Sequence, residues 1–117
     1  HIMDVLIEEK IAQAVSLKRD SDFNGANLIY EQLNDQYPHS PVILKSWAKT
    51  LVCLGLYEDA INKFQLAVKL FIPQGMENHA WQCNNQIMEI RNRSKTPEQF
   101  KKYIRAVSGG TILDPKM

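Results

Sequence analysis

The chain has few cysteines, no long apolar run and no leader-like start. Its 117 residues include only two cysteines, Cys53 and Cys83, and their spacing is not that of metal ligands. We expect them to be small buried side chains on helices rather than a disulfide. No apolar run approaches the roughly 20 residues that a membrane-spanning helix needs. Because no basic start precedes an apolar stretch, we expect no signal peptide and place the chain in the cytoplasm.

Motifs that carry catalysis are also missing. The sequence has no Gly-rich phosphate loop and no nucleophile motif. His39 falls in an expected turn and His79 on an apolar stripe, positions where histidines are more often structural. Glu58 and Asp59 fall in the first turn of an expected helix, where acidic residues favour the helix dipole. We therefore expect neither enzymatic activity nor a cofactor.

The net charge of +1 hides an asymmetry along the chain. Residues 1–40 hold three Lys or Arg against seven Asp or Glu, whereas residues 41–117 hold eleven against six. The basic excess gathers near the C-terminus, at Arg91, Arg93, Lys95, Lys101, Lys102 and Arg105. Phe100 and Tyr103 fall on the opposite, apolar face of that segment, so we expect a solvated basic face rather than a nucleic-acid site.

Apolar spacing and turn residues predict an all-α chain. We expect helices at about 4–19, 22–36, 41–54, 57–71, 74–93 and 97–107. They form one helical domain over residues 4–108. Residues 109–117 follow Gly109-Gly110 and are expected to be a flexible tail. His1-Ile2 ahead of Met3 indicates that residues 1–3 consist of two added residues followed by a native start at Met3.

A repeat with a period of 34 residues is the most informative feature of the sequence. Aligning Ala26 with Ala60 brings residues of matching type into register: Ala14 with Ala48, Leu17 with Leu51, Phe23 with Tyr57, Tyr30 with Phe64, and Leu33 with Ala67. The alanines fall where two helices come closest, because only small side chains let the backbones approach. Gly55 falls in the turn between two helices and tolerates a positive φ.

This pattern resembles the tetratricopeptide repeat family, whose period is 34 residues. The better copy spans about residues 41–74. The copy at about 7–40 has Lys10 and Gln13 where large apolar residues are expected, and Ser21 where the turn glycine is expected. The resemblance implies a right-handed α-solenoid of antiparallel helix pairs. It would hold two full repeats, followed by an irregular C-terminal helical pair that acts as a cap.

The resemblance also implies a function, because the first helix of each repeat lines a concave groove in this family. The positions that face the groove are Ile11, Val15, Lys18, Val42, Lys45, Lys49, Val52 and, with Ala80 as the anchor of the fifth helix, Trp81. We expect a scaffold or adaptor that binds a protein or peptide segment with acidic and apolar residues. One alternative is a module that associates with itself as a homodimer. Binding of nucleic acid or an anionic surface through the basic C-terminal helices is a weaker alternative.

Overall fold

The structure is a computed structural model that describes the backbone of residues 2–92 and the side chains of residues 5–92. All regular structure in this range is helical, which confirms the predicted class. The elements are α1 (Ile2–Arg19), α2 (Phe23–Gln36), α3 (Pro41–Cys53), α4 (Tyr57–Phe71), the short 3-10 helix η1 (Ile72–Gln74) and α5 (Glu77–Asn92). The predicted helix at 97–107 and the predicted tail at 109–117 lie outside the described residues.

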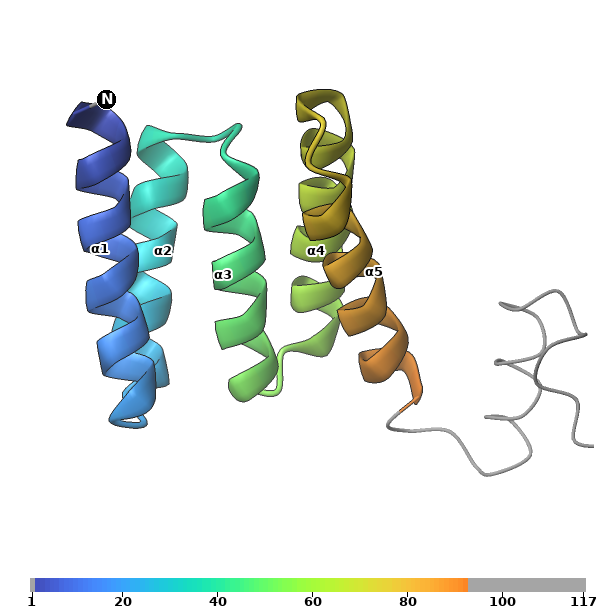
Figure 1. Ribbon diagram of the computed structural model, residues 1–117. Coiled ribbons are helices and arrows are strands. Elements are labelled where there is room, and N and C mark those ends of the chain that lie inside the picture. The colour runs from blue at the N-terminus through green and yellow to red at the C-terminus, as the bar shows by residue number, and fades with distance from the viewer. Residues whose placement is uncertain (1, 93–117) are drawn as a thin grey trace, which may run out of the picture. The chain divides into compact units, whose positions relative to one another are not determined.

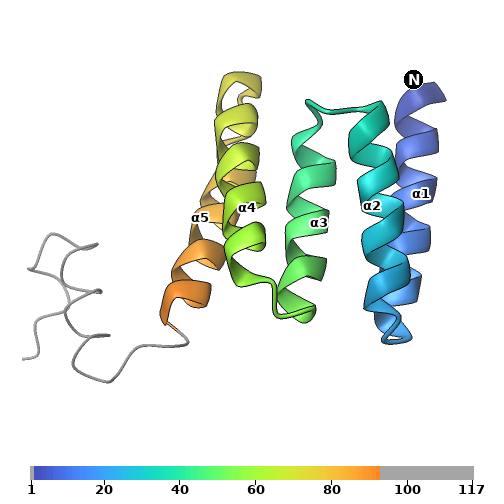
Figure 2. The same ribbon diagram turned by 180° about the vertical axis from the view of Figure 1, so that it is seen from behind.

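The chain divides into two compact units, and the first, His1–Ile87, holds most of the described elements. In this unit α1 packs on α2, α2 on α3, and α3 on α4. Consecutive helices run in alternating directions. α1 and α5 lie in front of α2 and α4 in Figure 1 and behind them in Figure 2.

The core of the first unit forms where the repeat predicts it. Trp47, Leu51, Ala60 and Phe64 are all buried, as expected from the second copy of the repeat. The four alanines that the repeat places at close helix contacts, Ala14, Ala26, Ala48 and Ala60, are fully buried. A small side chain at each of these positions lets two helix backbones approach while larger neighbours fill the surrounding grooves.

Three helix ends use the same backbone turn. After α1, the amide of Asp22 donates to the carbonyl of Leu17, and the amide of Ser21 donates to the carbonyl of Lys18. The same pair of hydrogen bonds spans residues 51–56 after α3 and residues 71–76 after η1. This Schellman turn requires one residue in the left-handed region. That residue is Ser21 (φ 66°), Gly55 (φ 76°) or Gly75 (φ 74°).

Two expectations need correction. The fifth helix begins at Glu77 rather than at residue 74, because η1 and the left-handed Gly75 end the preceding helical segment first. Both cysteines are free, but only Cys83 is buried, while Cys53 is exposed at the end of α3. Among the described residues, no helix has the length and apolar character to cross a bilayer.

Candidate functional site

Three of the predicted site residues lie on α1. Ile11, Val15 and Lys18 are spaced four and three residues apart, so they share one face of the helix. Val15 is 40% exposed, and Ile11 and Lys18 are half-buried. The neighbouring Ala14 is fully buried, which turns Val15 about 100° away from the helix contact. The stripe therefore offers apolar surface to solvent with a lysine at one end.

Four more predicted residues form a matching stripe on α3. They are Val42, Lys45, Lys49 and Val52. Val42 is 42% exposed and Lys49 is exposed, whereas Lys45 and Val52 are half-buried. Ala48 is fully buried against a neighbouring helix, which directs Lys49 toward solvent in the same way as Ala14 directs Val15.

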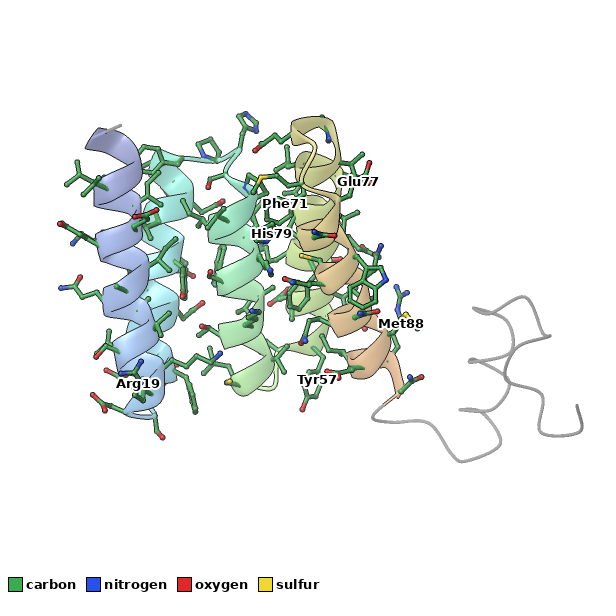
Figure 3. All side chains as sticks on the ribbon, viewed as in Figure 1. Arg19, Tyr57, Phe71, Glu77, His79 and Met88 are labelled. Carbon is green, nitrogen blue, oxygen red and sulfur yellow. The ribbon has the colours of Figure 1, made fainter. Side chains whose placement is uncertain are left out.

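The structure connects Lys45 to α5. Its Nζ lies 3.1 Å from Nδ1 of His79, and it donates a second hydrogen bond to Oε1 of Gln82. The His79 ring stacks on Phe71 of α4, with 5.0 Å between ring centroids and 21° between ring planes (Figure 3). Lys45 therefore joins α3 to α5 rather than projecting freely into solvent.

The two lysines of α3 differ in their surroundings. Burial lowers the pKa of Lys45 from its ordinary value, and the positive charge of Lys49 lowers it further. Lys49 is exposed and has no acidic partner among the residues that the structure describes. Lys49 is thus the lysine of this stripe whose charge is open to an incoming group.

Trp81 stands apart from the lysines. It lies on α5 and is 66% exposed. Because an α-helix turns about 100° per residue, Trp81 is displaced by about 100° from Gln82 and by about 200° from His79. The side of α5 that reaches Lys45 is therefore not the side that carries Trp81.

The sequence did not identify His79 and Gln82 as neighbours of the site. The apolar stripe suggested a structural role for His79, and the stacking of its ring on Phe71 agrees with that reading. Its contact with Lys45 depends on how α5 lies beside α3, and no pattern within either helix encodes that placement. Gln82, an exposed polar residue on a helix, gave no signal at all.

A cavity of about 460 Å³ opens elsewhere, between α1 and α2. None of the eight predicted residues contributes to its lining, which consists of Leu6, Glu9, Lys10, Gln13, Leu33, Gln36 and Tyr37. Lys10 and Gln13 correspond through the repeat to Leu44 and Trp47, which are buried in the second pair. The cavity is therefore polar at positions where the next helix pair uses apolar side chains for packing.

The described side chains include no group of three or more His, Cys, Asp or Glu residues placed to hold a metal ion. Comparison of the chain with protein-family models, with curated proteins and with solved structures finds no match. The case for a function therefore depends on the geometry of the α1 and α3 stripes.

Proposed function

We propose that this chain is a protein-interaction module of the tetratricopeptide-repeat type. In this proposal the helix pairs stack as a right-handed solenoid, and a partner segment lies in the groove formed by the first helix of each pair. Binding involves no catalysis and no cofactor. The partner is a peptide or protein segment that carries both acidic and apolar residues.

The repeat is supported by equal environments at positions 34 residues apart. Tyr30 and Phe64 are both fully buried, and Ser21 and Gly55 both adopt the left-handed conformation in the turn between paired helices. Such equivalence is expected when two copies of one helix pair stack. The turn between paired helices does not require a glycine, since Ser21 adopts the same left-handed conformation as Gly55.

The observation that carries the function is the exposed composition of the two stripes. Val15 and Val42 expose apolar surface, and Lys49 adds a charge with no acidic partner among the described residues. An acidic group of a partner would gain a charge-assisted hydrogen bond from Lys49. Apolar side chains on either side of that group would cover the valines.

Self-association through the face that carries the α1–α2 cavity is less favoured. A further helix pair would have to cover Lys10 and Gln13, and burying an unpaired charge or amide is unfavourable. The basic residues that would support an anionic surface lie mostly beyond residue 92, outside the described residues.

A random peptide library displayed on phage tests the proposal directly. We expect selection on the intact protein to enrich peptides that combine acidic and apolar residues. Lys49→Glu should weaken binding of a selected peptide by about tenfold, because it places like charges together at the interface. Lys69→Glu is the matched control, since Lys69 is an exposed lysine on α4 and should leave binding unchanged.

Amide chemical shifts in NMR spectra then locate the peptide. Changes concentrated around Val15, Val42 and Lys49 support the proposed face. Changes confined to α2 and α4, or to the α1–α2 cavity, would overturn it. Equal affinities of the wild type and the Lys49→Glu variant would overturn it as well.

A further inference from the structure

Asn24 and Gly25 form the only Asn-Gly pair of the sequence, and they occupy the first turn of α2. Such a pair is chemically labile, because glycine has no Cβ to hinder the approach of its amide nitrogen to the preceding side chain. The Gly25 nitrogen can attack Cγ of Asn24, so that a C–N bond forms, ammonia leaves with the side-chain nitrogen, and a succinimide ring results. Water then opens the ring at either carbonyl, which leaves aspartate or isoaspartate in place of the asparagine.

The carboxyl group of Asp22 accounts for the glycine in this pair. Asp22 is the N-cap of α2, and its Oδ1 accepts a hydrogen bond of 2.9 Å from the amide of Gly25. A Cβ on Gly25 would lie 2.5 Å from Oδ2 and 2.9 Å from Cγ of the same carboxyl group. Any other residue at this position would therefore have to displace the cap, and the chain keeps the labile pair together with the cap.

The same cap opposes the reaction while the first turn of α2 is closed. The attacking nitrogen must lose its proton, but that proton is donated to Asp22, and a neighbouring carboxylate opposes the loss of a proton. The helical backbone also holds ψ near about −42°, whereas ring closure requires the nitrogen to rotate toward the side-chain Cγ. The side chain of Asn24 is exposed, so burial gives it no protection from water. Protection therefore depends on the closed turn.

We propose that Asn24 is the deamidation site of this chain and that the Asp22 cap sets the rate of its modification. Opening of the first turn of α2 releases the Gly25 amide and frees the rotation that ring closure needs. Helix ends open locally more often than the whole domain unfolds, so this local event controls the reaction. Water is the only co-reactant. Because the chemistry needs no partner, it is independent of the proposed binding function.

The two products have opposite consequences for α2. Aspartate adds a negative charge to a first turn that holds no acidic residue, and such a charge is favourable at a helix N-terminus. Isoaspartate instead inserts a methylene group into the main chain ahead of Gly25. That insertion displaces the amides of Gly25 and Ala26, which donate to Oδ1 and to the carbonyl oxygen of Asp22. Ala26 is fully buried, so the displacement also disturbs the core.

Ageing of the full chain in warm, mildly alkaline buffer, followed by peptide mapping with mass spectrometry, tests the proposal. In the wild type we expect deamidation at Asn24 before any other asparagine. Asp22→Ala should accelerate it about fivefold, because loss of an N-cap acceptor opens the first turn more often. Asp22→Ser keeps an acceptor and should match the wild type. Ile61→Val, in the buried face of α4, is the control for a general loss of stability and should also match the wild type.

Two further variants examine the chemistry and its products. In the Asp22→Ala background, Gly25→Ala should suppress the acceleration, because a Cβ then hinders the attacking nitrogen. Asn24→Asp should melt at or above the wild-type temperature, whereas the isoaspartate form purified from aged protein should melt below it. Equal rates for the wild type and Asp22→Ala, an equal acceleration in Ile61→Val, or earlier deamidation at another asparagine would each overturn control by the cap.

Discussion

Replacement of Trp47 by Ala is the sharpest test of how the first unit is held together. Trp47 lies on α3 and is only 9% exposed. Its indole Nε1 donates a 2.6 Å hydrogen bond to Oδ1 of Asn27 on α2. The ammonium of Lys63, on α4, lies 4.7 Å from the ring centroid. One side chain of α3 therefore links that helix to two others, α2 and α4, through burial, a hydrogen bond and a cation–π contact.

The expected loss follows from these contacts. A buried tryptophan removes about 150–250 Å² from water. At about 25 cal/mol per Å² this corresponds to about 4–6 kcal/mol, as an upper value. The hydrogen bond adds about 1 kcal/mol and the cation–π contact about 0.5 kcal/mol. After partial relaxation around the cavity, and rehydration of Asn27 and Lys63, we expect Trp47→Ala to lower the free energy of unfolding by about 3–5 kcal/mol.

Chemical unfolding followed by far-UV circular dichroism measures this loss without depending on tryptophan fluorescence. Trp47→Phe keeps much of the packing but removes the donor, so it should lose about 1–2 kcal/mol. A double-mutant cycle of Trp47→Phe with Asn27→Ala should give a coupling energy of about 1 kcal/mol. A loss below about 1 kcal/mol for Trp47→Ala would refute the assignment of Trp47 to the core.

Two further changes test particular positions. The hydroxyl of Tyr30 interacts with Thr50 and Ser46, so Tyr30→Phe should destabilise by about 1 kcal/mol in chemical unfolding. Burial raises the pKa of Tyr30 above 10.0, so the folded state resists its ionisation. The wild type should therefore lose stability faster than Tyr30→Phe as the pH rises past 10.0, and parallel profiles would contradict this. Ser21→Gly should raise the melting temperature, because relief of about 1–2 kcal/mol of left-handed strain exceeds the entropic penalty of glycine, and a lower melting temperature would contradict it.

Much of the fold was predictable because local signals and packing agree along α1 to α4. The 34-residue period placed alanines at the helix contacts, and the structure buries all four of them. The period also aligned Ser21 with Gly55, and both residues are left-handed in the structure. The structure of α1 to α4 could be predicted from the sequence because turn residues and apolar spacing indicate the same helices.

The start of α5 was misplaced although its signal was present. Pro73 and Gly75 mark the end of a helical segment, yet the predicted helix was started at residue 74, ahead of Gly75. A glycine after the last helical turn favours the left-handed Schellman position, as Gly55 already shows in the second repeat. Applying the same rule at Gly75 would have started α5 after Met76, close to the observed Glu77.

The relation between α3 and α5 was harder to predict, because it depends on packing between helices. Strict continuation of the repeat would move the small-residue position from Ala48 to Gln82, but Ala80 is the buried residue and Gln82 is exposed. A shift of two residues rotates an α-helix by about 200°, which decides which side chains face a neighbour. Sequence spacing alone therefore could not bring Gln82 to Lys45.

The same packing separates the roles of two lysines that the sequence treats alike. Lys45 and Lys49 lie one turn apart on α3, and either could attract an acidic partner. Once α5 lies beside α3, Lys45 donates to His79 and Gln82, and a carboxylate would have to displace one of these acceptors to reach it. Lys49 needs no such exchange. Charge reversal at Lys45 would therefore remove its hydrogen bonds to His79 and Gln82 and also change the electrostatic field of the proposed groove, whereas reversal at Lys49 leaves those hydrogen bonds in place and acts through the field alone, including its effect on the pKa of Lys45. For this reason, affinity measured with Lys49→Glu reports on recognition, while Lys45 variants report first on the docking of α5.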